Sequence, residues 1–140
     1  MDKHFPNVLK GELFKDLRGK LMSCNEFDMS QIKRIYSIEN VDINYTRGWK
    51  GHLIEKRWFL CTRGAIKVSV ISIESLQKKI NNALHYELTD SNLDVLEVPA
   101  GYATLIQQKL SKSRIICFSD YHLNTSNDEE LRWPYNHFEI

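Results

Sequence analysis

The sequence has few of the residues that build cross-linked, membrane-spanning or low-complexity proteins. Among its 140 residues are three cysteines, three prolines and six glycines. Its longest apolar runs, such as Trp58–Cys61, fall far short of the roughly 20 residues that a membrane-spanning helix needs. The N-terminus lacks the apolar stretch of about 7–15 residues that marks a secretory signal. We therefore expect a cytoplasmic protein that does not associate with a membrane.

A large excess of charge of one sign is also lacking. Lys and Arg number 19 and Asp and Glu number 18, which gives a formal net charge of +1. This balance argues against a generally basic nucleic-acid-binding protein and against an acidic tail protein. Hydrophobic residues make up 42% and charged residues 26%, as in ordinary globular domains. Since no repeat or linker divides the chain, we expect one domain over residues 1–140.

Cysteine usage fits a reducing compartment. The three cysteines are an odd number without close pairing, and two of them, Cys61 and Cys117, lie inside apolar runs. Such positions suit reduced thiols packed in a protein core.

The dominant pattern is strand-like alternation in short runs. Such runs, about 10 residues apart, predict an all-β antiparallel sandwich or barrel. Arg63-Gly64 and Pro99–Gly101 have the composition of turns between strands, and only Ser75–Asn82 has helical spacing. The C-terminal Leu131–Pro134 is predicted to be extended and to pack on a sheet. The predicted strands cover residues 32–38, 57–62, 65–73, 84–88, 95–98, 104–107 and 114–119.

Basic residues gather in the middle of the chain. Six of them, with Glu55 as the only acid, lie between Arg47 and Lys67, and this stretch includes Trp49 and His52. Such a stretch suits a phosphorylated small molecule, because guanidinium groups bind phosphate in a bidentate manner. The alternative is solvated charge at a sheet edge, which discourages aggregation.

The segment Arg47–His52 is the densest in potential chemistry. Strand alternation places Gly48, Lys50 and His52 on one face. A Lys and a His side by side each disfavour the charged form of the other, which suits proton transfer near neutral pH. The alternative for His52 is a hydrogen-bonded structural histidine.

Several short motifs follow one another along the chain in a characteristic order. They are Asp16-x-Arg18-Gly19, Ile32-Lys33-Arg34-Ile35-Tyr36, Arg47-Gly48-x-Lys50-x-His52, Pro99-x-Gly101 and Ser119-Asp120-Tyr121. Their order and spacing resemble those of the cupin-fold enzymes of deoxysugar nucleotide metabolism. The resemblance is greater to the dTDP-4-oxo-6-deoxyglucose 3,4-ketoisomerases than to the dTDP-4-dehydrorhamnose 3,5-epimerases, and it covers nearly the whole chain.

The resemblance implies a cupin-type jelly-roll barrel with a sugar-nucleotide pocket inside it. It also implies a homodimer whose strands are exchanged or packed across the interface. The implied activity is isomerisation of a nucleotide-linked 4-keto-6-deoxysugar in surface polysaccharide biosynthesis. The reaction would proceed by acid/base enolisation, in which the substrate's own carbonyl acidifies the neighbouring C–H bond, so no cofactor is needed.

The metal ligands of other cupins are replaced in this chain. A metal-binding cupin presents His-x-His, a Glu four residues later, and a His three residues after the Gly of Pro-x-Gly. Lys50, Lys56 and Thr104 stand at three of these four positions, and only His52 remains. Even with Glu55 from a shifted register the ligands number two, which is too few for a divalent ion. We expect no metal.

The resemblance also assigns roles to catalytic candidates. His52 matches the second His of the ketoisomerase motif and is the expected general base. Lys50 replaces the first His and is expected to act as an electrostatic clamp on the enediolate oxygen. Tyr121 matches the acid tyrosine of the epimerases, with an aromatic anchor at a strand end as its alternative.

Six further residues are expected to bind substrate. Arg47 and Arg57 are candidates for the diphosphate or the sugar, and Arg18 resembles a nucleotide-side arginine offered across the dimer. Tyr36, Trp49 and Tyr102 are expected to line the pocket. The alternatives are turn chemistry for Arg18 and core packing for the aromatic residues.

Three other functions stay open from the sequence. The first is a 3,5-epimerase, although Lys50 stands where the epimerases have their base. The second is a non-catalytic cupin that binds a sugar nucleotide. The third is an unrelated all-β interaction domain whose basic stretch binds an acidic partner.

Overall fold

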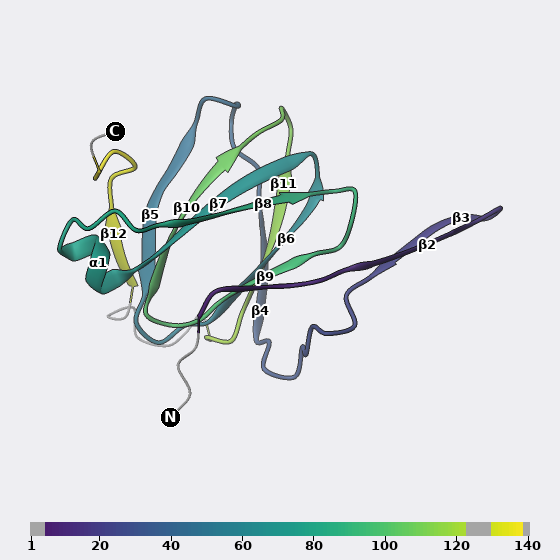
Figure 1. Ribbon diagram of the computed structural model, residues 1–140, viewed down its shortest axis with the longest axis horizontal. Coiled ribbons are helices and arrows are strands. Elements are labelled where there is room, and N and C mark those ends of the chain that lie inside the picture. Colours follow the sequence, from purple (N-terminus) through teal and green to yellow (C-terminus); the bar gives the residue numbers. More distant parts are fainter. Residues whose placement is uncertain (1–4, 123–129, 139–140) are drawn as a thin grey trace.

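Two packed antiparallel sheets of five strands each form the body of the protein (Figure 1). The computed structural model describes residues 5–122 and 130–138. In spatial order, the first sheet contains β1 (Asn7–Leu9), β9 (Val95–Val98), β6 (Arg57–Arg63), β11 (Arg114–Ser119) and β4 (Arg34–Ile38). The second contains β12 (Glu130–Trp133), β5 (Thr46–His52), β10 (Tyr102–Gln108), β7 (Ala65–Ser72) and β8 (Leu84–Thr89). The predicted all-β fold is confirmed.

The hydrophobic core fills the space between the two sheets over most of their width. On β7, Ile66, Val68 and Val70 point into this core, where they pack with Phe59 of β6 and Ile115 of β11. The strict alternation of β-branched residues along β7 produces this apolar face.

The opposite face of the second sheet is also covered. Ile71 of β7 packs there with Trp49, Ile73 and Leu76, and Phe138 of the C-terminal segment adds to the cluster. β7 is therefore covered on both sides at Ile71, the apolar residue of its outer face.

The helix α1 (Ile73–Gln77) begins and ends earlier than the predicted range of 75–82. It begins at Ile73 because the Ser72 side chain caps it, accepting a hydrogen bond from the backbone N–H of Ser75 at 3.1 Å. It ends before Lys79, whose φ of 56° is left-handed and incompatible with a continuing helix. The predicted range was wrong because side-chain spacing does not reveal a backbone reversal.

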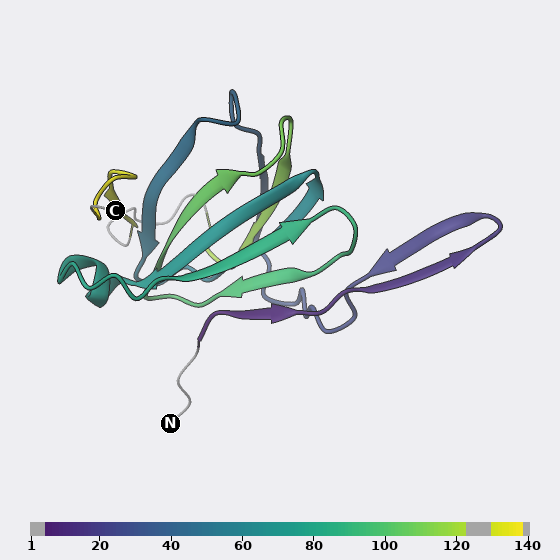
Figure 2. The ribbon, with the colours of Figure 1, turned by 45° about the horizontal axis from the view of Figure 1, so that its top comes forward.

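The predicted strand from residue 32 also begins later, at Arg34. The backbone N–H of Ile32 donates to the Met29 carbonyl at 3.1 Å, which makes residues 29–32 a turn. A further hairpin, β2 (Glu12–Asp16) and β3 (Gly19–Ser23), was absent from the predicted strands and projects from the body of the protein (Figure 2). Its turn is held by Asp16, whose Oδ1 accepts from the Arg18 backbone N–H at 2.9 Å.

Two glycines in turns differ in their surroundings, and this difference predicts different stability losses. Gly64 and Gly101 have φ values of 77° and 91°, which disfavour any residue with a Cβ. A Cβ on Gly64 would overlap Ser113, whereas a Cβ on Gly101 would meet no atom within 4 Å. We expect Gly101→Ala to lower the free energy of unfolding by about 1 kcal/mol and Gly64→Ala by about 2–4 kcal/mol.

Urea denaturation followed by tryptophan fluorescence measures both losses. Equal losses in the two variants would contradict the role given to Ser113.

Candidate active site

A cavity of about 320 Å³ lies between the sheets, where β4 and β6 face β5 and β10. The residues Phe59 and Ile106 belong both to its wall and to the hydrophobic core, so the cavity continues the core toward one side of the sandwich. Its other lining residues are mostly aromatic or cationic, with a few that are aliphatic or small: Tyr36, Ile38, Tyr45, Arg47, Gly48, Trp49, Lys50, Arg57, Thr104, Arg132 and Trp133.

A β-bulge in β5 brings two cations to this cavity. On β10, Thr104 lies opposite Lys50 and Ile106 lies opposite Arg47, so one residue of β10 faces two residues of β5. Arg47 and Lys50 both line the cavity, although regular alternation would direct them to opposite faces.

The same bulge leaves Trp49 with its ring on the outer face. There it packs with Ile71 and Leu76 and lies edge-on to Phe138 at 6.0 Å between ring centroids. Trp49 is among the residues that line the cavity, but its ring also belongs to the outer cluster.

Arg57 of β6 is the most deeply buried cation of the cavity. Its side chain is 2% exposed, and its Nη2 donates to the Lys50 carbonyl at 3.2 Å. Its guanidinium also lies 5.2 Å from the centre of the Phe59 ring. These contacts replace part of the hydration that the charge loses on burial.

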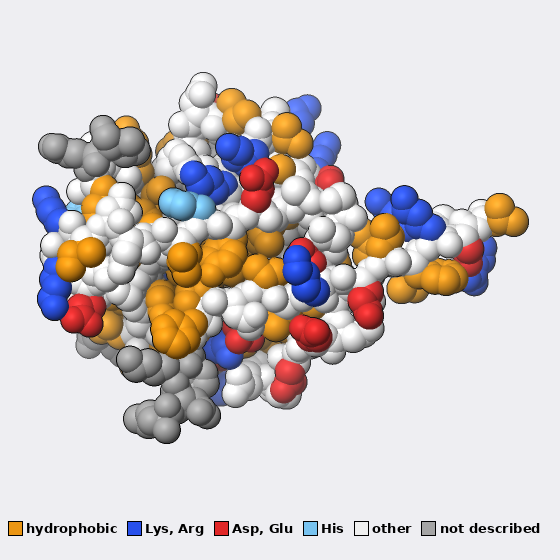
Figure 3. Space-filling model, viewed as in Figure 1, with side chains coloured by type: hydrophobic (Ala, Val, Ile, Leu, Met, Phe, Trp, Pro, Cys, Tyr) orange, Lys and Arg blue, Asp and Glu red, His pale blue; other side chains and the backbone are white. Residues whose placement is uncertain are grey.

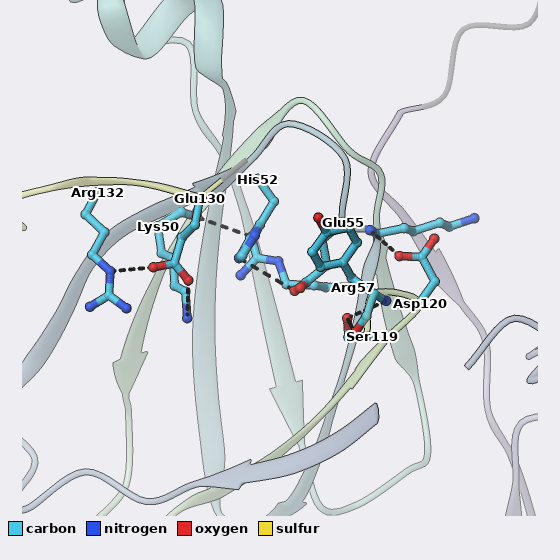
Figure 4. A network of polar contacts seen from close by, with 10 residues as sticks. Lys50, His52, Glu55, Arg57, Ser119, Asp120, Glu130 and Arg132 are labelled. Carbon is cyan, nitrogen blue, oxygen red and sulfur yellow. Dashed lines mark hydrogen bonds and ion pairs between the residues drawn. The ribbon is translucent and has the colours of Figure 1, made fainter. Parts of the chain in front are cut away.

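The C-terminal strand β12 completes the wall. Glu130 lies 3.2 Å from Lys50 Nζ and accepts a hydrogen bond from Arg132 Nε at 2.8 Å (Figure 4). Burial raises the pKa of Glu130, but Arg132 and Lys50 outweigh burial and hold it below its ordinary value. Arg132 and its neighbour Trp133 line the cavity, although neither was predicted from the sequence to be a site residue. The signal in the sequence that could have found them is the extended C-terminal segment, which was predicted to pack on a sheet.

His52 lies one inward position beyond Lys50 on β5 and is 3% exposed; it is not among the residues that line the cavity, whereas Lys50 and Arg57 are. Its Nε2 is 3.6 Å from Oε2 of Glu55, which is equally buried. In Figure 4, His52 of β5, Glu55 of the following loop and Arg57 of β6 reach into the same space. The predicted base therefore lies inside the protein, next to cavity-lining cations.

Tyr36 of β4 lines the cavity with a hydroxyl that stays protonated. The pKa of Tyr36 is raised to about 12, mainly because its side chain is buried. Burial likewise raises the pKa of the neighbouring Cys117 thiol to about 12. Near neutral pH, Tyr36 can donate a hydrogen bond and Cys117 is an inert thiol.

Besides His52, the structure places three predicted site residues away from the cavity wall. Tyr102 pairs with His52 across β10 and β5 but packs against the core. Tyr121 is half-buried in the turn after β11, where its backbone N–H donates to Ser119 Oγ at 3.0 Å. Arg18 lies at the tip of the projecting hairpin, in an ion pair with Asp16.

The described residues were also compared with the requirements of metal sites and membrane spans. Within residues 5–122 and 130–138, no group of three or more His, Cys, Asp or Glu side chains could hold a metal ion. In the same part of the chain, no helix is long and apolar enough to cross a membrane.

Sequence comparison gives no relative, whereas structural comparison does. No protein-family model matches the chain, and no curated protein matches it. A variant of the QdtA 3,4-ketoisomerase from Thermoanaerobacterium thermosaccharolyticum, in complex with TDP-4-keto-6-deoxyglucose, matches with a TM-score of 0.71 and 18% identity over 93% of this chain and 88% of that chain.

Two other solved structures have the same architecture. The WlaRB TDP-quinovose 3,4-ketoisomerase from Campylobacter jejuni matches with a TM-score of 0.69 and 15% identity, over 91% of this chain and 92% of that chain. The dTDP-4-dehydrorhamnose 3,5-epimerase from Bacillus anthracis matches with a TM-score of 0.76 and 16% identity, over 94% of this chain and 79% of that chain. The chain therefore has the cupin-type jelly-roll fold of the sugar-nucleotide 3,4-ketoisomerases and 3,5-epimerases.

Proposed function

We propose that the protein is an isomerase of a nucleotide-linked 4-keto-6-deoxysugar that moves the keto group between C4 and C3. The observation that carries the proposal is the cavity, whose polar wall contains four cations, Arg47, Lys50, Arg57 and Arg132, with a buried histidine beside them. The shared fold of proteins that act on TDP-linked ketosugars supports it. We expect the sugar product to serve surface polysaccharide synthesis.

The cations can bind the two negatively charged groups of the reaction, the diphosphate of the substrate and the enediolate oxygen of the intermediate. Arg47 and Arg132 are the more exposed pair and suit the diphosphate of the substrate, since a guanidinium binds phosphate oxygens in pairs. Lys50 and Arg57 are deeper and lie closer to His52, where the enediolate oxygen would form. A positive charge fixed there stabilises the intermediate more than the neutral ketone.

The proposed chemistry moves one proton from C3 to C4 and a second from the C3 oxygen to the C4 oxygen, and it needs no redox step. His52 takes the proton from C3 of the sugar, and the C3–H electron pair forms the C3=C4 double bond of an enediolate. Transfer of the C3 hydroxyl proton to the C4 oxygen and return of a proton to C4 then give the 3-keto product. Tyr36, with its protonated hydroxyl in the cavity, and Tyr121 are the candidates to assist proton return.

Solvent exchange tests this activity directly. Incubation of the protein with dTDP-4-oxo-6-deoxyglucose in D₂O should place deuterium at C3 of the recovered substrate, because the enediolate picks up a solvent proton. NMR spectroscopy of the sugar measures the incorporation. Exchange at C5 as well would favour the 3,5-epimerase, and saturable binding without exchange would favour the non-catalytic cupin. Absence of exchange with every nucleotide-linked ketosugar would refute an enzyme of this class.

Replacement of the proposed base gives the second test. His52→Asn should lower the exchange rate by roughly 10²-fold or more, as expected for loss of a general base. His85→Asn is the matched control, because His85 lies on β8 at the far edge of the second sheet and is exposed. An unchanged rate in His52→Asn would place the base elsewhere, with Lys50 as the first candidate.

The projecting hairpin β2–β3 supports the second part of the proposal, a homodimer. Every residue of β2 is exposed, and Phe14 and Leu21, which are 59% and 63% exposed, lie opposite each other across the hairpin. Figure 3 shows hydrophobic side chains on this projection. Clustered exposed apolar groups mark interaction sites, so we propose that the hairpin packs on a second copy and carries Arg18 toward it.

Charge on the hairpin should therefore dissociate the dimer. We expect sedimentation velocity to find a dimer for the native chain and a monomer for Phe14→Lys/Leu21→Lys, with unchanged circular dichroism. Leu110→Lys, at another exposed apolar residue, is the control and should stay dimeric. A native chain that sediments as a monomer would refute the dimer.

A further inference from the structure

We propose that Glu55 is a positioning residue that orients His52 and makes it a stronger base. The inference rests on the proposed function, in which His52 takes the substrate proton. It assigns a task to a carboxylate that lies outside the cavity wall and that the mechanism above does not use.

The loop between β5 and β6 is folded against the usual preference for burial. Leu53 and Ile54 are 51% and 61% exposed, whereas the next residue, Glu55, is 3% exposed. Turning a carboxylate inward and two large apolar side chains outward costs free energy on both counts. Departures of this kind concentrate at functional sites, where a particular geometry is selected over stability.

The position of Glu55 is fixed by the neighbouring backbone. Asp120, in the turn after β11, accepts a hydrogen bond from the Lys56 backbone N–H at 2.8 Å through Oδ1, and its own backbone N–H donates to the Lys56 carbonyl at 3.2 Å. These two bonds attach the loop to the first sheet, next to Glu55 in the chain. Oε2 of Glu55 is thereby held 3.6 Å from Nε2 of His52.

The charges around His52 explain why a carboxylate is needed. Lys50 and Arg57 are cations beside it, and they disfavour the imidazolium that forms when His52 accepts a proton. Glu55 opposes this effect at short range, in a site where burial weakens solvent screening. Among the described residues, the other charged or titratable groups on the elements packed around it are Glu130 and Arg132 of β12, Tyr102 of β10, Tyr36 of β4, Cys117 of β11, and Asp120 in the turn after β11.

In the reaction, the proton moves from the sugar C3 to His52 and stays there until it is returned. Glu55 takes no proton and touches no substrate atom. It stabilises the imidazolium electrostatically and restricts the rotation of the ring, as a carboxylate does for the histidine of a catalytic triad.

The first test needs no substrate. NMR titration of the His52 ring in the free protein, assigned with His52→Asn, compares the native chain with Glu55→Gln. Loss of the carboxylate should lower the pKa of His52, so that its acid dissociation constant rises at least tenfold. Glu87→Gln, on the exposed face of β8, should leave the titration unchanged. An unchanged His52 titration in Glu55→Gln would overturn the inference.

A second variant covers the case in which Glu55→Gln does not fold. Glu55→Asp keeps the charge on a shorter side chain, so the carboxylate retreats from His52 and the pKa of His52 should fall by a smaller amount. An unchanged titration in this variant would equally overturn the inference.

The second test uses the pH profile of the exchange reaction. Because only unprotonated His52 accepts a proton, kcat/KM rises with pH through the pKa of His52. Glu55→Gln should move this rise to lower pH and reduce kcat by roughly 10- to 100-fold. A loss that is the same at every pH and leaves the midpoint unmoved would indicate a merely structural role and overturn the inference.

The two proposals fail in different ways. If the native chain catalyses no exchange, the isomerase is refuted, while the NMR titration still decides whether Glu55 controls His52. If exchange occurs and the titration does not respond to Glu55, the isomerase stands and the positioning role is refuted.

Discussion

The whole site depends on how β5 presents its side chains. Regular alternation would direct Lys50 and His52 inward and Arg47 outward, but the bulge opposite Leu105 brings Arg47 back to the cavity. Gly48, which lies at the bulge, lets the C-terminal segment come close to β5, because a Cβ there would lie 2.8 Å from the Trp133 carbonyl oxygen. One strand thus supplies a cation at the mouth, a cation in the wall and the proposed base.

The interior between the sheets has an apolar part and a part with buried polar and charged side chains. Over β7, β9 and the centre of β6 the inner faces are apolar and closely packed, with Phe59 and Leu96 fully buried. Toward β4 and β5 the same interior holds Arg57, Thr104 and His52. The cavity lies on this side, where buried charge needs polar partners.

Burying charged side chains in the site costs free energy, but it also holds them in a fixed geometry. Taking Arg57 and Glu55 out of water costs several kcal/mol per ion before their contacts are counted. Part of this cost is offset by the hydrogen bond from Arg57 to the Lys50 carbonyl and by the Asp120 contacts that hold the loop. The apolar half of the sandwich supplies the stability that allows such an arrangement. A solvated surface stretch of the same composition would hold its charges in no fixed geometry.

Most of the strands and the turn at Gly64 could be predicted from the sequence, because alternation and turn chemistry are local properties. The order of motifs also pointed to His52, Lys50, Arg47 and Tyr36, and the basic stretch pointed to Arg57. Which of these residues meet depends on the tertiary fold. Arg132 comes to Lys50 through the pairing of β12 with β5, some 80 residues apart in the chain, and Glu55 turns toward His52 because Asp120 anchors its loop. The bulge in β5 and the projection of Arg18 on its hairpin likewise arise from backbone pairing, which side-chain periodicity does not encode.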